Sequence, residues 1–290
     1  MVYIKRKGDV SMFLSDQNIE NVPFSFIKKY LIFVFIGMAV MATVPARAAS
    51  VGSPETQGKG KVGAGVEWSY IFNRDLEFKK ATRPAGHATD RPVNFRIVKG
   101  SNVAGKISYG VFDDMDIYVK LGVANYDLKG DVFVGDNQTV AENLSARNAF
   151  LYGGGFKLAH ELRKGWIVGC DAQYLTSDHE LDFRATTLAT GALTTARYAD
   201  LKIQEWHAAP YVAKKIANFT PYLGVRYSDL RMEQKKPNDP KRWDDLIFYA
   251  DCNVGVFTGI DWNIGKGFKL NVEGRFVDET AISVGTAYRF

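Results

Sequence analysis

The last nine residues constrain the fold of this chain more than any other stretch. Residues 282–290 read ISVGTAYRF and alternate apolar with small or polar side chains. A repeat of two is typical of a β-strand, in which successive side chains point to opposite faces. One predicted face carries Ile282, Val284, Thr286, Tyr288 and Phe290, and the other carries Ser283, Gly285, Ala287 and Arg289. The first face suits lipid and the second suits a polar interior.

The preceding stretch shows the same repeat with charged side chains. Residues 268–276 read FKLNVEGRF, so Lys269, Asn271, Glu273 and Arg275 share one face. A water-soluble core would not accept such a face, whereas the hydrated lumen of a membrane barrel would. Other strands repeat the pattern less cleanly. The residues predicted to face the lumen are Glu67, Lys106, Lys120, Lys157, Asp171, Arg226, Asp251, Lys269, Glu273, Arg275 and Arg289.

Alternating segments fill the chain from residue 61 to the end, and their connections are short and long in turn. The predicted strands are 61–72, 103–111, 117–126, 150–159, 166–175, 201–212, 222–228, 248–262, 268–277 and 282–290. Stretches 127–147 and 176–199 are predicted to be long polar loops. The strand at 201–212 is the weakest, because Glu205, Trp206, His207 and Pro210 interrupt its alternation. We therefore predict an all-β fold, a transmembrane antiparallel up-and-down β-barrel of about ten strands, with eight or twelve as alternatives.

The terminal strand resembles the C-terminal strand of bacterial outer-membrane β-barrel proteins, a porin-like family. The resemblance implies that Tyr288 and Phe290 form part of the signal read by the barrel-assembly machinery. It also implies a location in the bacterial outer membrane, in contact with outer-membrane lipid and lipopolysaccharide. Tight turns would then face the periplasm, and longer loops would face outward.

The N-terminal region is typical of a cleaved signal peptide. Residues 30–44 form an apolar run of fifteen, preceded by Lys28 and Lys29. That run is shorter than the roughly 20 apolar residues that span a bilayer. Small residues Ala46 and Ala48 occupy the positions read by signal peptidase, so cleavage is predicted between Ala48 and Ala49. The predicted organisation is a signal peptide at 1–48, with Met12 as an alternative start, an N-terminal linker at 49–60 and a barrel at 61–290.

Charge and cysteine content exclude several classes of protein. The formal charge of +5 falls to about +2 after cleavage, because residues 1–48 carry six basic and three acidic side chains. Nucleic-acid binding would require a concentrated basic face, so no nucleic-acid partner is predicted. Two cysteines are too few for a disulfide framework, and neither has the spacing of a metal ligand. No metal site or cofactor is predicted.

The sequence lacks the complete catalytic motifs of enzymatic barrel families. The chain resembles omptin proteases in length and strand count, but those require an Asp-x-His pair, and the nearest match here is Ser177-Asp178-His179-Glu180. Adjacent residues on a strand point to opposite faces, so this Asp and His would not share one water. Lipid A deacylases and outer-membrane phospholipases pair a His with a nearby Ser, and no His-x-Ser occurs. No catalytic residue is predicted, and an outer-membrane protease or lipid-modifying enzyme is the least favoured hypothesis.

Two functional hypotheses remain. The first is a structural or surface-interaction barrel whose lumen is mostly filled by paired charges, with an extracellular ligand that the sequence does not identify. The second is a small porin for ions or small solutes. Barrels of about eight strands are filled by side chains, whereas those of 16 to 18 strands leave a channel, so ten strands favour the closed barrel. Basic residues Lys235, Lys236, Lys241 and Arg242 are either ligands for lipopolysaccharide phosphates or simply solvated.

Overall fold

The computed structural model describes residues 50–82, 91–134, 138–187, 193–235 and 245–290. The predicted signal peptide, with Ala46, Ala48 and Ala49, lies outside the described residues, as do Lys236, Lys241 and Arg242. No helix within these ranges is long and apolar enough to cross a membrane.

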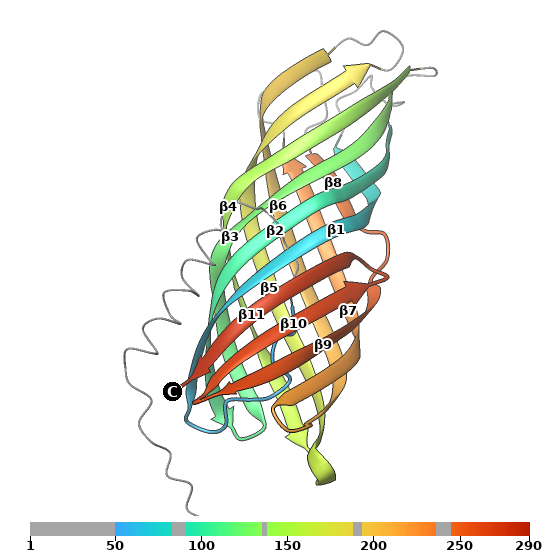
Figure 1. Cartoon of the computed structure of the whole chain (residues 1–290). Helices are drawn as coiled ribbons and strands as arrows, with labels where there is room; N and C mark the ends of the chain where they lie inside the picture. The colour runs from blue at the N-terminus through green and yellow to red at the C-terminus, as the bar shows by residue number, and fades with distance from the viewer. Residues whose placement is uncertain (1–49, 83–90, 135–137, 188–192, 236–244) are drawn as a thin grey trace, which may run out of the picture. The chain divides into compact units, whose positions relative to one another are not determined.

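The described residues form a closed antiparallel β-barrel (Figure 1). Its strands are β1 (Val62–Thr82), β2 (Arg91–Phe112), β3 (Met115–Val134), β4 (Gln138–Glu161), β5 (Trp166–Thr187), β6 (Leu193–Lys214), β7 (Phe219–Lys235), β8 (Asp245–Ala250), β9 (Val254–Gly265), β10 (Phe268–Phe276) and β11 (Thr280–Arg289). A short 3₁₀ turn, η1 (Arg163–Gly165), joins β4 to β5. Pairing of β11 with β1 closes the ring. The predicted all-β barrel is therefore confirmed.

The ring changes its strand number along the barrel axis. Strand β1 pairs with β11 over residues 63–73 and with β8 over residues 76–82. Strand β7 likewise pairs with β9 over residues 219–227 and with β8 over residues 231–235. The half that contains β9–β11, called here the lower half, therefore has ten strands. The upper half has eight, β1–β8, so the predicted count of ten applies to one half and the alternative of eight to the other.

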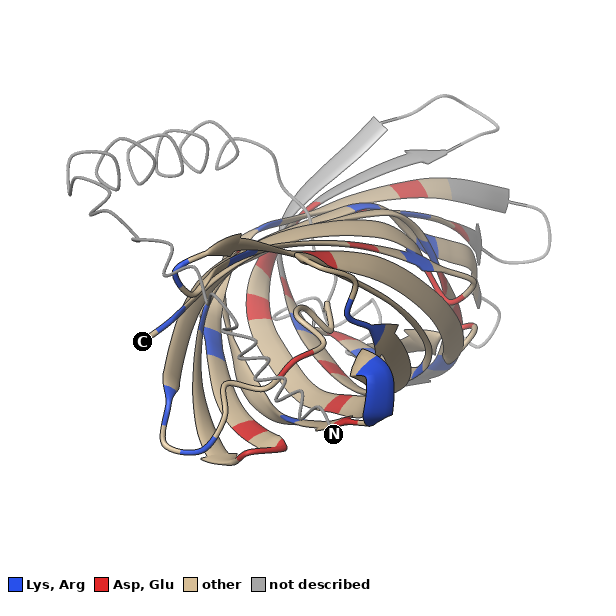
Figure 2. Cartoon of the chain, turned by 60° about the horizontal axis from the view of Figure 1, so that its bottom comes forward, with Lys and Arg blue, Asp and Glu red and all other residues tan. Residues whose placement is uncertain are grey.

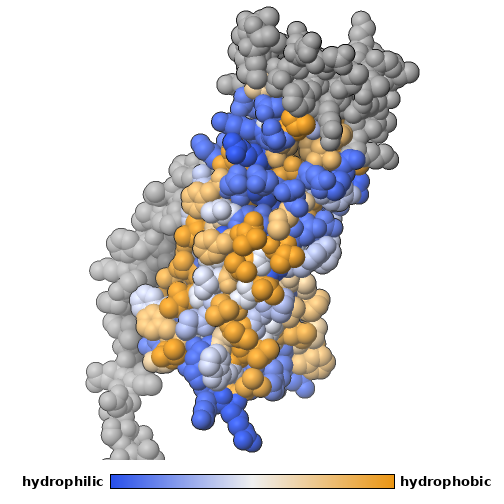
Figure 3. All heavy atoms as spheres, turned by 90° about the vertical axis from the view of Figure 1, so that its right-hand side faces the viewer, coloured by the Kyte–Doolittle hydropathy of each residue, from blue (hydrophilic) through white to orange (hydrophobic). Residues whose placement is uncertain are grey.

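Along each long strand, alternate side chains point inward and outward throughout, but the polarity of the inward and outward side chains is reversed between the two halves. On β7 the outward side chains change from exposed Leu223, Val225 and Tyr227 to Asp229, Arg231 and Glu233. The inward side chains change in the opposite sense, from Tyr222, Arg226 and Ser228 to Leu230 and Met232. Figure 3 shows the outer result on one face of the barrel, with apolar side chains over the lower half and hydrophilic ones above.

Aromatic side chains mark the edges of the apolar outer band. Near the lower edge, Phe219 stacks on Trp262 with ring centroids 5.7 Å apart, and Tyr288 contacts Phe290 at 4.9 Å. At the upper edge, the indole of Trp206 lies 5.2 Å from the Tyr227 ring and its N–H donates to Asp229. Amphipathic rings at the two borders of an apolar belt are typical of membrane interfaces.

Two of the predicted long loops are instead strand, so those predictions were wrong. Strand β3 continues to Val134 and β4 begins at Gln138, while β5 continues to Thr187 and β6 begins at Leu193. The repeat of two persists there, but the apolar side chains, such as buried Leu128 and Leu181, point inward. A strand surrounded by water needs its apolar side chains inside, which is the reverse of the lipid-facing pattern.

The upper half contains an apolar core. Its buried members come from β1–β8, with Ala281 of β11 at its lower border. They include Leu76, Phe95, Ile97, Tyr126, Leu128, Leu144, Leu181, Leu201, Ile203, Leu230, Met232, Leu246 and Phe248. Side chains from all eight strands therefore meet on the axis, as expected for an eight-stranded barrel. In the strand predicted as weakest, Glu205 and His207 simply lie on the inner face below this core, and Pro210 is exposed.

Candidate functional site

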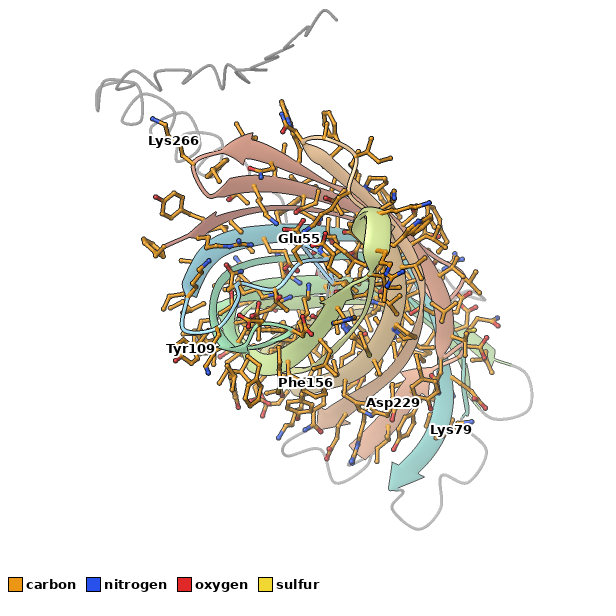
Figure 4. All side chains as sticks on the ribbon, turned by 90° about the horizontal axis from the view of Figure 1, so that it is seen from below. Glu55, Lys79, Tyr109, Phe156, Asp229 and Lys266 are labelled. Atoms are coloured by element: carbon orange, nitrogen blue, oxygen red, sulfur yellow. The ribbon has the colours of Figure 1, made fainter. Side chains whose placement is uncertain are left out.

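The N-terminal segment, residues 50–60, lies inside the lower half of the barrel. Ser50 and Val51 are fully enclosed, with exposed fractions of 2% and 0%. Figure 4 places Glu55 within the ring of strands, whereas Tyr109 and Phe156 point away from it. The segment reaches the lower rim at Gly60, whose N–H donates to the Gly110 carbonyl over 2.8 Å. The stretch predicted as a linker thus occupies the lumen.

Side chains of the wall bind the backbone of this segment. Carboxylates accept its N–H groups, and lysine, tyrosine and arginine side chains donate to its carbonyls. The N–H bonds are Ser50 to Glu67 (3.2 Å), Val51 to Glu273 (3.1 Å) and Gln57 to Asp116 (2.9 Å). The carbonyl bonds are Lys120 to Ser50 (3.3 Å), Lys157 to Val51 (2.8 Å), Lys157 to Ser53, Tyr211 to Pro54 (2.9 Å) and Arg289 to Thr56 (3.0 Å). Buried peptide groups that would otherwise lack partners are satisfied in this way.

The same wall residues form ion pairs with one another. Glu67 accepts from Lys120 at 3.0 Å, and Asp171 lies 3.7 Å from Lys157 and also accepts from Tyr118. Seen from the lower end, basic and acidic positions are distributed around the ring (Figure 2). Mixed charges at these distances neutralise one another, so the described residues of the lower lumen form no charge ladder of a single sign.

Glu55 belongs to the segment and lies near the lower rim. Its carboxylate lies 2.7 Å from the Lys269 ammonium and 3.5 Å from that of Lys215 in the β6–β7 turn. Burial alone would raise the pKa of Glu55, but the charges of Lys269, Lys215 and Arg289 outweigh it and hold that pKa below its usual value. An ionised Glu55 therefore contributes to holding the segment in place.

A second charged cluster, called here the junction cluster, lies where ten strands become eight. Its members are Arg74, Glu205, Arg226, Glu273, Arg275, Asp278 and Glu279, and Ser228 lies among them. Contacts within it are Arg74 to Glu205 (2.8 Å), Arg74 to Glu279 (3.3 Å), Arg226 to Glu279 (2.7 Å), Arg226 to Asp278, Arg275 to Glu273 (2.8 Å) and Arg275 to Glu279 (2.8 Å). Asp278 and Glu279 form the turn between β10 and β11, so the cluster fixes the end of that hairpin inside the wall.

Strand β9 makes room for this turn at one glycine. A Cβ at Gly255 would lie 1.9 Å from an Asp278 carboxylate oxygen. Only glycine lets the carboxylate approach the strand so closely. The turn itself is strained, because Val277 has a φ of 83°, which β-branched residues rarely adopt.

Most of the residues predicted to face the lumen belong to one of two groups: the ion pairs around the N-terminal segment, called here the lower network, and the junction cluster. Glu67, Lys120, Lys157 and Asp171 lie in the lower network, Arg226, Glu273 and Arg275 in the junction cluster, and Lys269 and Arg289 beside the segment. The Lys106 ammonium lies 3.8 Å from the centre of the Tyr118 ring. The prediction that Asp251 faces the lumen was wrong. Asp251 is exposed at the break between β8 and β9, where the strand is interrupted at residues 251–253.

Several residues of these networks were not predicted. Arg74 and Glu279 were assigned to connections rather than strands, and Glu55 to a linker. Glu205 and His207 were treated as interruptions of a strand, although His207 contacts Asp171 at 3.3 Å inside the lumen. The inward alternation of Glu205, His207 and Ala209 was the one available signal.

A Ser and His pair lies inside the upper half. Ser177 is 2.7 Å from Nε2 of His179, and Nδ1 of that ring is 2.7 Å from the Arg147 carbonyl. The pairing of β4 with β5 shifts between Ala146 and Leu151, and His179 binds a carbonyl within this irregular stretch. Asp178 is exposed on the opposite face. The arrangement therefore serves the backbone of an irregular strand and does not assemble the Asp and His on one face.

One small cavity lies between the segment and the wall. Its volume is about 60 Å³, and Gln57, Glu67, Lys106 and Ser108 are among its lining residues. Because a water molecule occupies about 30 Å³ of liquid, the cavity has room for one or two waters. No group of three or more His, Cys, Asp or Glu side chains in the described part of the chain could hold a metal ion.

Comparison with known proteins agrees with the barrel fold. Residues 52–188 match the family model of the OmpA-like transmembrane domain. The fold is similar to that of the outer membrane protease OmpT from Escherichia coli, with a TM-score of 0.51, 11% identity and coverage of 83% of this chain and 99% of that chain. The translocator domain of the autotransporter NalP from Neisseria meningitidis gives a TM-score of 0.41 at 9% identity, covering 92% and 98%. No curated protein sequence matches the chain. The chain is therefore a closed antiparallel β-barrel, and its residues 52–188 are similar to the OmpA-like transmembrane domain.

Proposed function

We propose that this protein is a closed outer-membrane barrel with a structural or surface-interaction role, rather than a pore or an enzyme. The observation that carries this proposal is the filling of the lumen at two levels by two kinds of contact. The N-terminal segment and its ionic partners fill the lower half, and the apolar core occupies the upper half, next to a cavity of about 860 Å³ lined mainly by residues of β1–β4.

A solute that crosses the barrel has to pass both of these regions, one after the other. A permeating ion needs water or polar ligands along its whole path. The upper core offers side chains such as Leu230, Met232 and Phe248, each at most 3% exposed, and so provides neither. An ion that passed the lower half would still meet an apolar barrier, which supports the closed barrel over the small porin.

The outer surface supports a role at the cell surface. The apolar band covers only the lower half, so the upper half extends beyond it with a polar exterior. With the tight turns and the C-terminus in the periplasm, the upper half projects outward. Outer-membrane lipid and lipopolysaccharide then surround the band, and polar strands and their connections are available to an extracellular ligand.

An enzymatic role is not proposed. The similarity to a protease structure is at 11% identity and concerns the fold. In this chain Asp178 is exposed and His179 is buried on the opposite face of β5. The paired Ser177 and His179 are enclosed, with exposed fractions of 0% and 2%.

Removal of residues 1–48 is part of this proposal. Ser50 is enclosed in the lumen and bonded to Glu67 and Lys120, with the junction cluster and apolar core farther along the axis. If cleavage makes Ala49 the first residue, no further chain has to leave the enclosed lumen ahead of Ser50. The mass of protein isolated from outer membranes should correspond to residues 49–290, and a mass that includes the leader would contradict this step.

Assembly through the C-terminal strand is the remaining part. Tyr288 and Phe290 are exposed on the outer face, in contact with each other. The aromatic ending is thus accessible to the assembly machinery before the barrel closes. A Phe290→Ala change should lower the amount in the outer membrane more than Phe276→Ala, which removes a similarly outward ring, and equal amounts would contradict this role.

Single-channel recording tests the function directly. Purified protein that migrates differently before and after boiling is added to a planar bilayer. The closed barrel predicts no stable conductance steps. Reproducible steps with ion selectivity would overturn it in favour of the porin.

A further inference from the structure

The N-terminal segment is held differently from every strand of the wall. Between residues 50 and 57 the backbone groups of the segment bond to side chains of the wall, and backbone pairing with β2 begins only at Gly58–Lys61. A strand of the wall, by contrast, is held by a continuous backbone ladder. The segment thus resembles a docked peptide more than an element of the barrel.

We infer that the lower lumen is a peptide-binding site, occupied in this chain by residues 50–57, that accepts an extended peptide of the same kind when the chain's own segment is displaced. The site binds mainly through the peptide backbone. This inference does not depend on whether the barrel conducts or on what its outer surface contacts.

The backbone contacts define the general class of ligand. Charged groups of opposite sign serve the two kinds of peptide atom: carboxylates of Glu67, Glu273 and Asp116 accept N–H bonds, and Lys120 and Lys157 donate to carbonyls. Charge-assisted bonds of this kind are stronger than neutral ones. Because every peptide offers the same N–H and carbonyl groups, such a site selects an extended backbone before it selects a sequence.

One side chain supplies an apolar anchor. Val51 is fully buried against Ala159, Ile167, Ala209, Tyr211, Ala213, Tyr222 and Phe257. The carboxylate that accepts the Val51 N–H, Glu273, is buried beside this pocket. A small branched apolar residue is therefore favoured at this position, and a carboxylate there would meet both apolar walls and a like charge.

Polar side chains add a second selection. Ser53 donates to Asp261 over 2.8 Å, and Glu55 pairs with Lys269 at 2.7 Å. An acidic residue four positions after the apolar anchor thus has a dedicated cation. The ligand class is an extended peptide with a small apolar residue near its amino end and an acidic residue four positions later.

The segment's path shows how it enters. At the lower rim it turns through Gly58 and Gly60, with φ of 86° and 76°. A Cβ at Gly110 would lie 1.9 Å from the Gly58 carbonyl oxygen, so the entry is tight at this point. A peptide reaches the pocket from the lower rim, with its amino end leading.

The test uses the whole barrel chain with Val51→Asp. The substituted segment should leave its pocket, and a fluorescent peptide with the sequence of residues 50–59, SVGSPETQGK, should then bind saturably. Wild-type protein, whose site is occupied, should bind at least tenfold more weakly. The matched control is Lys61→Asp, which places a carboxylate on an exposed side chain just outside the segment and should behave as wild type. A control peptide with Asp at its second position should not bind.

Two results would overturn the inference. One is a Val51→Asp barrel that keeps its heat-modifiable migration but does not bind the native peptide. The other is equal binding by wild type and Val51→Asp, which would place the peptide elsewhere.

A measurement on the unaltered protein covers the case in which Val51→Asp does not fold. Hydrogen exchange should show the amides of residues 50–57 opening as one unit, at least tenfold faster than the ladder amides of β5 between residues 166 and 175. Exchange as slow as that of β5 would mean that the segment is an integral part of the wall, and would overturn the inference.

Discussion

The two halves of this barrel have opposite polarity, although the same strands build both. In the lower half apolar side chains face outward and charges face inward, whereas in the upper half the outward face is polar and the interior is apolar. On β7 the change occurs between Arg226 and Leu230, without any change in which residues point inward. Alternation along a strand therefore specifies two faces, and the residue types on those faces specify the surroundings.

Different interactions also stabilise the interiors of the two halves: ion pairs and hydrogen bonds in the lower half, and apolar burial in the upper half. Ion pairs and hydrogen bonds are directional, and a buried charge that loses its partner is costly. Apolar burial is non-directional and responds mainly to lost volume and contact. Substitutions in the two interiors should therefore fail in different ways, and the junction cluster should be the most sensitive region.

The largest effect is expected at Arg226. Its guanidinium pairs with Asp278 and Glu279, all three side chains being buried. Replacing it by Met leaves two carboxylates without this cation and should lower the free energy of unfolding by about 3–5 kcal/mol. Denaturant unfolding followed by loss of heat-modifiable migration measures the change.

The control for Arg226→Met is Arg147→Met in the upper half. Arg147 makes a two-bond contact with Asp182, but on the exposed face. Solvent screens such pairs, so no measurable change in stability is expected. Equal losses for both variants would show that burial of the junction cluster is unimportant.

The next effect compares two leucines of one strand. Leu230 is 1% exposed in the apolar core, and Leu223 is 62% exposed on the outer face. Leu230→Ala should lower the free energy of unfolding by about 2–5 kcal/mol through lost burial and a cavity. Leu223→Ala in the same unfolding experiment should cost much less, and the reverse order would contradict the assignment of inner and outer faces.

A pH dependence is expected in the lower half. Because the pKa of Glu55 is lower in the folded protein, its stabilising contribution is present above the unfolded value, near 4.3, and is lost as pH falls through the folded pKa. Amide exchange of residues 50–57, corrected for intrinsic rates, should therefore accelerate below about pH 4. Glu55→Gln should remove this acceleration, and an unchanged pH profile in that variant would assign it to another group.

The smallest effect is expected at Val277 in the β10–β11 turn. Its positive φ is unfavourable for a β-branched residue, and its side chain is 71% exposed. Val277→Gly should raise the free energy of unfolding by about 1 kcal/mol as the backbone strain is relieved. Val254→Gly, an exposed strand position without positive φ, should lower it, and a loss in both variants would show that the strain is negligible.

Sequence patterns predicted the barrel and much of its inner wall, because the inward charges on β10 and β5 occur at alternate positions of the sequence. They did not predict that strands continue above the lipid. Residues 127–131 and 141–147 retain a repeat of two, but with its polarity reversed, and an expectation of outward apolar residues treats them as loops. The pattern was present, and the assumed surroundings were wrong for that half.

The N-terminal segment left no comparable signal. Residues 50–60 are polar and rich in glycine, and most of their contacts are made by backbone atoms. Backbone contacts impose no periodicity on the sequence. The side chains of Glu273 and Lys157, which do bind the segment, were predicted to face the lumen, but their partner was not.

Single-channel recording of the Val51→Asp protein tests the two-level closure most directly. This change should displace the lower filling and leave the apolar core of the upper half intact. We expect the folded Val51→Asp protein to show as little conductance in a planar bilayer as the wild type. Stable conductance steps from the variant alone would show that the N-terminal segment is the one seal, and would contradict a dry upper half.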